Sequence, residues 1–287
     1  MKKKYSLNTG FLSAAIILFT ACVFKYAYSM EFKRIVSLNL CTDQLVVKIA
    51  QRHNIAALSF LATDPRSSAA VKLAKGIPRV RGSVEEVIRL KPDIVFSGVQ
   101  INPAQIKLLK RFKLKIKQVP IATNLKLVED NIRAVANALN LKKRGAAIVQ
   151  EFRKTIKKYS KRTVLHYKPI AVLLWPNGLS SGSGTLPHSV LEKAGFRNLA
   201  ALINKSGTSF LSIEMLLRIN PDLLVLGQSL PNPSLAHKFL EHSALRTKFS
   251  ETKKLFVPDN LWLCGTTDTA AAVRILSSFH GKHENEK

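Results

Sequence analysis

Two stretches of the chain share one pattern: GSVEEVIRLKPDIVFSG over residues 82–98 and FLSIEMLLRINPDLLVLG over residues 210–227. At an offset of 129 residues, six of the sixteen positions from Ser83 to Gly98 are identical, and most others exchange one aliphatic side chain for another. Each copy predicts a helix capped at Ser83 or Ser212, a turn at a Pro-Asp pair and a buried strand. A repeat of this kind predicts two similar halves.

Alternation of strands and helices continues on both sides of each copy. The first half predicts strands at 34–39, 55–60, 94–98 and 115–120, and helices over 42–52, 83–90 and 103–112. The second half predicts strands at 169–175, 223–227 and 254–258, and helices over 188–194, 212–219, 234–249 and 267–279. Continuously apolar strands that alternate with helices are typical of an α/β fold with parallel sheets covered by helices.

A helical region rich in lysine and arginine, residues 124–161, lies between the two halves. Within it, apolar side chains recur on one helical face, and two residues are candidates to interrupt the helix. The stripe is Ile148, Phe152, Ile156 and Tyr159, and the candidate interruptions are Asn140 and Gly145. We expect an N-terminal lobe over 30–139, a linker helix over 140–162 and a C-terminal lobe over 163–287. The alternative is an ordinary crossover helix within one large domain.

The composition is strongly basic, with 45 Lys and Arg against 18 Asp and Glu in 287 residues and a net charge of +27. Such a charge first indicates nucleic acid or an anionic membrane as a partner. Residues 1–29, however, have the organisation of a secretory signal: Lys2 to Lys4, an apolar stretch from Phe11 to Phe24, and Ala27-Tyr28-Ser29. Removing its four lysines leaves +23. Export to the periplasm argues against nucleic acid as the partner.

Two other fates of this N-terminal segment remain open. The fourteen residues from Phe11 to Phe24, interrupted only by Ser13 and Thr20, would span about 21 Å as a helix. This is short of the roughly 30 Å hydrocarbon core, which favours cleavage over a retained anchor. A lipoprotein processed at Cys22 is the second alternative, although Phe19-Thr20-Ala21 fits a lipobox poorly.

The repeat and three further segments resemble the substrate-binding proteins of ABC importers for cobalamin, ferric siderophores and haem. These segments are RIVSLNLCTDQL at 34–45, NGLSSGSGTLPHSVLEKAGFRNLA at 177–200 and PDNLWLCG at 258–265. The resemblance covers about residues 34–279. It implies two Rossmann-like lobes with parallel sheets, joined by a single long rigid helix, with a ligand cleft between them and no catalysis.

Glu85 and Glu214 occupy equivalent positions in the two copies of the repeat. From the residues alone, each is a first-turn acid that complements unpaired N–H groups at a helix N-terminus, or an acidic contact for a basic partner surface. The resemblance implies that they dock, one per lobe, on arginines of a permease dimer.

The resemblance also implies that the ligand lies against loops at the carboxyl ends of the strands. The candidate ligand residues are Asn39, Cys41, Thr42, Asp43, Phe60, Gln100, Trp175, Asn177, Gln228, Trp262 and Cys264. Trp175 and Trp262 suit a flat or bulky ligand, or pack in the core. Cys41 and Cys264 would face each other across the cleft as a disulfide, as two free thiols or as metal ligands.

An enzyme is the competing interpretation. Gly178-Leu179-Ser180-Ser181-Gly182 spells the nucleophile-elbow pattern of a serine hydrolase, and Asp222 with His237 or His242 follows in suitable order. The context disfavours it, because Pro176-Asn177 separates the preceding strand from the turn.

We therefore expect a monomeric periplasmic substrate-binding protein of an ABC importer, with the permease dimer and a small-molecule metal chelate as partners. A ferric siderophore or similar iron complex is the first choice of ligand, followed by cobalamin and then haem. No cofactor, no metal site of its own and no nucleic-acid partner are expected.

Overall fold

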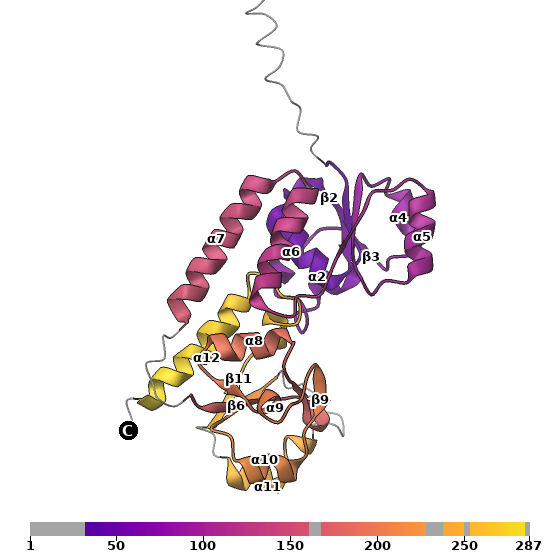
Figure 1. Ribbon diagram of the computed structural model, residues 1–287. Coiled ribbons are helices and arrows are strands. Elements are labelled where there is room, and N and C mark those ends of the chain that lie inside the picture. Colours follow the sequence, from indigo (N-terminus) through magenta and orange to yellow (C-terminus); the bar gives the residue numbers. More distant parts are fainter. Residues whose placement is uncertain (1–31, 161–167, 228–237, 250–252, 285–287) are drawn as a thin grey trace, which may run out of the picture. The chain divides into compact units, whose positions relative to one another are not determined.

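The first half of the chain forms a five-stranded parallel sheet in the computed structural model, which describes residues 32–160, 168–227, 238–249 and 253–284 (Figure 1). Its strand order is β3-β2-β1-β4-β5. The strands are β1 (Ile35–Ser37), β2 (Ile55–Ser59), β3 (Arg79–Val80), β4 (Ile94–Gly98) and β5 (Ile116–Val119), and the helices between them are α2 (Leu40–Ile49), α3 (Val71–Ala74), α4 (Val84–Arg89) and α5 (Pro103–Arg111).

The second half forms a four-stranded parallel sheet of order β11-β10-β6-β8. Its strands are β6 (Ile170–Leu174), β8 (Arg197–Asn198), β10 (Leu223–Leu226) and β11 (Lys254–Phe256). A small antiparallel pair, β7 (Leu179–Ser181) with β9 (Thr208–Phe210), accompanies it. The helices are α8 (Leu186–Lys193), α9 (Leu199–Leu202), α10 (Ile213–Ile219), α11 (Ser243–Lys248) and α12 (Thr269–Glu284). The predicted α/β fold with two parallel sheets is confirmed.

Successive side chains along each strand point to opposite faces of the sheet, and both faces are buried. In β1 and β4, Ile35 and Ile94 face the main core, whereas Val36 and Val95 face smaller clusters on the other side of the sheet. This pattern follows from the period of two along a strand, and it explains why the strands read as unbroken apolar runs. The main core also contains Leu173 of β6 and side chains of α2, α6 (Leu125–Ala138), α7 (Lys142–Tyr159), α8 and α12, so both sheets share it.

The repeat builds the equivalent part of each sheet. Ser83 Oγ accepts a hydrogen bond from the N–H of Glu86, and Ser212 Oγ accepts one from the N–H of Met215, so both predicted helix caps are confirmed. The strand that follows then pairs with the first strand of its sheet, β4 with β1 and β10 with β6.

The aspartates of the repeat hold the neighbouring strand in place. Asp93 Oδ2 accepts hydrogen bonds from the N–H groups of Lys33 (2.8 Å) and Arg34 (3.0 Å), immediately before β1. Asp222 Oδ2 accepts one from the N–H of Ile170 (2.7 Å), at the start of β6. The sequence assigned these residues only to a turn; their cross-strand partners are 59 to 60 and 52 residues away.

The basic helical region consists of two helices. Asn140, with φ of 61°, breaks the helix between α6 and α7, as predicted. Gly145 does not interrupt α7 but lies inside it, where an added Cβ would come within 2.3 Å of Ala136 Cβ. The glycine lets α7 pack closely on α6, and α7 also contacts α12 (Figure 1). Phe152 and Ile156 of the predicted stripe are buried.

Two helix predictions need correction. The helix expected from Thr42 begins at Leu40, because the Asn39 side chain accepts from the N–H of Cys41 and caps it. The helix expected over 234–249 is wrong in its described part, where only Ser243–Lys248 is α-helical. His242 caps that helix through Nδ1, which accepts from the N–H of Ala244 (3.2 Å). His237 lies outside the described residues.

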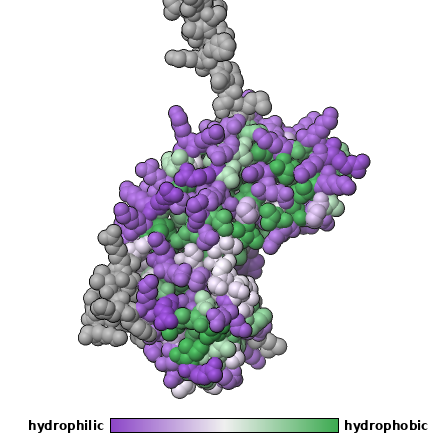
Figure 2. Space-filling view, viewed as in Figure 1, coloured by the Kyte–Doolittle hydropathy of each residue, from purple (hydrophilic) through white to green (hydrophobic). Residues whose placement is uncertain are grey.

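The surface is largely hydrophilic on the face shown in Figure 2, with hydrophobic side chains gathered over parts of it. Within the described ranges, no helix combines the length and apolar character needed to cross a bilayer.

Candidate functional site

Cys41 and Cys264 form a disulfide, with their Cα atoms 4.8 Å apart and a sequence separation of 223. Cys41 lies in the first turn of α2, directly after β1, and Cys264 lies in the loop after β11. The bond therefore joins the carboxyl end of a first-sheet strand to that of a second-sheet strand. In the part of the chain that the structure describes, no group of three or more His, Cys, Asp or Glu side chains is arranged to hold a metal ion.

Other contacts join the same loops. Asn260 Nδ2 donates to the carbonyl of Pro65 (3.0 Å), and Lys48 Nζ lies 3.0 Å from Asp268 Oδ2. Gly265, at φ of 53°, packs so closely that an added Cβ would lie 2.5 Å from Ala122 Cβ. The segment 259–268 of the second half is thus fastened to the first half at several points.

The two tryptophans meet edge to face, with ring centroids 6.3 Å apart and an interplanar angle of 67°. Trp175 Nε1 donates to Asp259 Oδ1 (2.7 Å), and the ring stays half-buried. Trp262 is only 3% exposed and belongs to the main core. Core packing is therefore the role of Trp262 in this conformation, and Trp175 is the one with an accessible surface.

The glycine that ends each copy of the repeat makes room for a nearby side chain. Gly98 lies against Asn39, just after β1, and Gly227 lies against Trp175, just after β6. A Cβ on Gly98 would lie 3.1 Å from Asn39 Nδ2, and a Cβ on Gly227 would lie 2.5 Å from Trp175 Nε1. Sequence reasoning aligned these glycines but missed their function. Their position at the end of a buried strand was the available signal, because glycine there marks a close approach of another group.

Thr42 and Asp43 are buried, so neither side chain is open to a ligand in this conformation. Both are 1% exposed; Thr42 Oγ1 lies 2.7 Å from Ser37 Oγ, and Asp43 Oδ1 accepts from the N–H of Ser59 (3.2 Å). Ser59 Oγ also donates to Asp43 Oδ2. Burial raises the pKa of Asp43 to about 6, against hydrogen bonds from Ser37 and Ser59 that lower it. These two residues tie α2 to β1 and β2, and we remove them from the set of ligand contacts.

Stability should depend on pH through Asp43. Because its pKa is raised from 3.8 to about 6 by folding, the free energy of unfolding should fall by about 3 kcal/mol as the pH rises from below 4 to above 6. Urea unfolding of the wild type and Asp43→Asn across this range measures the effect. The stability of the wild type relative to the variant should decline with pH. A difference between the two proteins that stays constant with pH contradicts the assignment.

The other predicted ligand residues differ in their exposure. Asn39 is half-buried, whereas Gln100 and Asn177 are exposed and Phe60 is 56% exposed. Asn177 has φ of 59° in the turn Pro176–Gly178, a conformation that asparagine tolerates. Gln228 lies outside the described residues.

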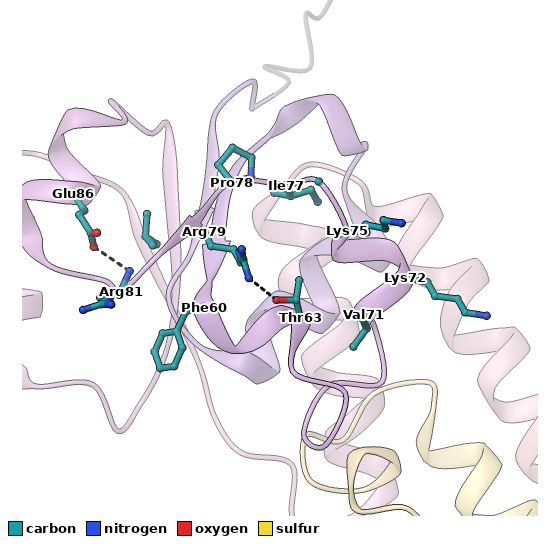
Figure 3. Close-up of a pocket in the computed structure, with 12 residues that line it drawn as sticks. Phe60, Thr63, Val71, Lys72, Lys75, Ile77, Pro78, Arg79, Arg81 and Glu86 are labelled. Carbon is teal, nitrogen blue, oxygen red and sulfur yellow. Dashed lines mark hydrogen bonds between the residues drawn. The ribbon is translucent and has the colours of Figure 1, made fainter.

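A hollow of about 880 Å³ lies beside β3, with Phe60 at its rim (Figure 3). Its lining is Phe60, Thr63, Val71, Lys72, Lys75, Gly76, Ile77, Pro78, Arg79, Val80, Arg81 and Glu86. Four of these side chains are cationic, and Arg79 Nη1 donates to Thr63 Oγ1 (3.0 Å). Because β2 and β3 are parallel, the residues that follow them, including Phe60 and Arg81, lie at the same edge of the sheet.

Within the described residues, no carboxylate lies within 4.0 Å of a cation of this hollow. Its only acid, Glu86, accepts from the backbone N–H groups of Arg81, Gly82 and Ser83. Sequence reasoning missed Lys72, Lys75, Arg79 and Arg81. The signal was present as KLAKGIPRVRG at 72–82, which carries four cations and no acid.

Glu85 and Glu214 are exposed in the first turns of α4 and α10. The backbone N–H of Glu85 and the Ser83 hydroxyl lower the pKa of the Glu85 carboxyl. The Ser212 hydroxyl, the backbone N–H of Glu214 and His242 lower the pKa of Glu214. Both carboxylates are therefore ionised and open to solvent at neutral pH.

The hydrolase pattern does not form a nucleophile elbow. Ser180 is fully buried in the middle of β7, opposite Ser209 of β9, and no turn from strand to helix occurs at that residue. An elbow requires an exposed serine at such a turn, so the arrangement gives the enzyme interpretation no support.

Comparison with known proteins is consistent with this architecture. A family model described as periplasmic binding protein matches residues 35–260. An uncharacterized ABC transporter substrate-binding lipoprotein of Bacillus subtilis is 26% identical over 208 residues, covering 68% of this chain and 63% of the relative. A cobalamin-binding protein of Halobacterium salinarum is 24% identical over 203 residues, covering 69% and 55%. The chain thus spans 55 to 63% of the length of these curated relatives.

Solved structures share the fold at low sequence identity. The periplasmic haem-binding protein RhuT of Roseiflexus sp. RS-1 matches with a TM-score of 0.68 and 19% identity, covering 86% of this chain and 98% of that one. The periplasmic vitamin B12-binding protein BtuF of Vibrio cholerae matches with a TM-score of 0.66 and 16% identity, covering 88% and 98%. Since the family model spans 226 of the 287 residues, the chain belongs to the periplasmic binding protein family.

Proposed function

We propose that this protein is the substrate-binding protein of an ABC importer and captures an anionic metal chelate, with a ferric siderophore or similar iron complex as the first choice. The observation that carries the choice of ligand is the cationic hollow beside Phe60. Family membership and the similarity to a substrate-binding lipoprotein and a cobalamin-binding protein support the class of function.

The candidate ligands differ in net charge. Ferric complexes of catecholates or citrate carry net negative charge, whereas cobalamin offers little charge to a cluster of cations. Lys72, Lys75, Arg79 and Arg81 provide donors for carboxylate or catecholate oxygens, and charge-assisted hydrogen bonds of this kind are the stronger ones. Phe60 and the half-buried ring of Trp175 offer apolar faces for the organic part of the chelate.

The proposed site consists of Asn39, Phe60, Gln100, Trp175, Asn177 and Gln228, to which we add Lys72, Lys75, Arg79 and Arg81. We place the protein in the periplasm as a monomer after export directed by residues 1–29, with lipidation at Cys22 as the alternative. Residues 30–139 and 163–287 are the proposed lobes, residues 140–162 are the linker, and Glu85 and Glu214 dock on the permease dimer.

A ligand panel tests the proposal. Tryptophan quenching should show tight binding of ferric citrate or a ferric catecholate siderophore, and weaker binding of cyanocobalamin and haemin. Arg79→Gln combined with Arg81→Gln should weaken binding of the anionic iron complex at least about tenfold, since a charged hydrogen bond contributes about 1.5–3 kcal/mol.

The matched control removes two exposed cations from α7, Lys154→Gln with Lys157→Gln, and should retain wild-type affinity. Equal loss in the two variants would show that net charge alone acts. If cobalamin or haemin binds most tightly, and if the Arg79→Gln, Arg81→Gln variant binds it as the wild type does, that compound becomes the assigned ligand. Failure of every chelate to bind would overturn the proposed function.

A further inference from the structure

The stretch KLLKRFKLKIK at residues 107–117 carries six cations and no acid. It covers the second half of α5 and the start of β5, the edge strand of the first sheet. No acidic residue occurs between Asp93 and Glu129, so the local sequence offers these cations no partner. The concentration of positive charge is far above that of an ordinary mixed-charge surface.

Four of these cations form an open surface, which we call the basic face: Lys107, Lys110, Arg111 and Lys113. All four are exposed, and none lies within 4.0 Å of a carboxylate among the residues that the structure places. Lys107, Lys110 and Arg111, with Pro103 and Ile106, line a hollow of about 430 Å³ on the surface of α5.

Exposed apolar side chains accompany the basic face. Phe112 is 53% exposed and Leu108 is 38% exposed, and both lie among the cations in sequence. An aromatic ring flanked by lysine and arginine is a combination that suits the headgroup region of a membrane, where the ring enters the interface and the cations contact phosphates.

The basic face lies next to the helix that carries Glu85. Val87 of α4 and Leu109 of α5 pack in one cluster with Val95 of β4, and Gln105 Nε2 donates to the carbonyl of Gly82 just before α4. Figure 1 shows α4 and α5 side by side. If Glu85 docks on a permease embedded in the bilayer, its neighbour α5 comes close to the lipid around that permease.

We propose that the basic face binds anionic phospholipid headgroups and holds the protein at the membrane surface beside its permease. Positive side chains near an anionic bilayer each strengthen binding by about fivefold, and the attraction falls off within a Debye length. This binding goes beyond ligand capture; only the orientation toward the permease rests on the proposed function.

Vesicle co-sedimentation of the purified protein tests the proposal. The protein should bind vesicles of phosphatidylglycerol and phosphatidylcholine, bind phosphatidylcholine alone far more weakly, and be released by added salt. The variant Lys107→Gln, Lys110→Gln, Arg111→Gln, Lys113→Gln should bind the anionic vesicles at least about tenfold more weakly. All four changes are at exposed positions, so the fold should be retained.

The matched control removes the same charge from α7: Lys142→Gln, Lys143→Gln, Lys154→Gln and Lys157→Gln, all exposed. It should bind vesicles nearly as the wild type does. Equal loss in the two variants, or wild-type binding that does not depend on phosphatidylglycerol, would overturn the proposal. A basic-face variant that loses affinity for single-stranded DNA but not for vesicles would assign the face to another polyanion. The assay contains neither chelate nor permease, so its failure is distinct from failure of the transport function.

Discussion

Replacing Cys264 with serine should lower the free energy of unfolding by about 4–5 kcal/mol. The disulfide to Cys41 closes a loop of 223 residues, and in the chain-entropy model the stabilisation by a cross-link increases with the length of the loop it closes. Denaturation by urea, followed by tryptophan fluorescence, measures the change. A loss of this size is a large part of the stability of an ordinary domain.

Reductant provides the control for this prediction. It should destabilise the wild type by about the same amount as the substitution, and it should leave Cys264→Ser unchanged. The double variant Cys41→Ser, Cys264→Ser should match the single variant, because either change removes the same bond. An unfolding midpoint that is the same in wild type and variant, with or without reductant, would show that the non-covalent contacts Asn260–Pro65 and Lys48–Asp268 suffice to hold these loops.

If Glu85 and Glu214 dock on a permease as proposed, reversing both charges should reduce transport at least about tenfold while leaving ligand affinity intact. Glu85 and Glu214 are exposed and ionised, one on each repeat, so Glu85→Lys with Glu214→Lys replaces attraction to a cationic permease surface by repulsion. Uptake of radiolabelled iron complex by cells, together with tryptophan quenching of the purified variant, separates the two effects.

Two acids remote from the repeat provide the matched charge change. Asp130→Lys with Glu151→Lys introduces the same charge on α6 and α7, and should leave uptake near the wild-type level. Loss of ligand affinity in the glutamate variant would place Glu85 or Glu214 in the binding site and end the docking assignment. Equal loss of uptake in both double variants would indicate a response to net charge.

Local signals explain the parts of the fold that could be predicted. Ser83 and Ser212 cap their helices through contacts three residues away, and Asn140 breaks the basic helical region at a single left-handed residue. Continuous apolar strands likewise reveal a parallel sheet because both of its faces are covered. The prediction over 234–249 failed in its described part, because His242 caps a helix that begins only at Ser243.

The exposure of the site residues could not be predicted from local sequence patterns. The sequence predicts a ligand role for Asp43, but Ser59, sixteen residues later, donates to its carboxylate in the interior. Trp175 and Asp259 meet across 84 residues, and Trp262 enters the core, so only one of the two tryptophans keeps an accessible surface.

The sequence by itself determined the repeated helix-turn-strand unit, the α/β class and the equivalence of Glu85 and Glu214, because periodicity, caps and turns depend on neighbours within a few residues. Only the tertiary structure decided that Cys41 pairs with Cys264, that Gly98 and Gly227 make room for Asn39 and Trp175, and that four cations line one hollow beside Phe60. These relations join residues that are distant in sequence. They arise when the strand ends of each sheet are brought together, which the order of residues does not reveal.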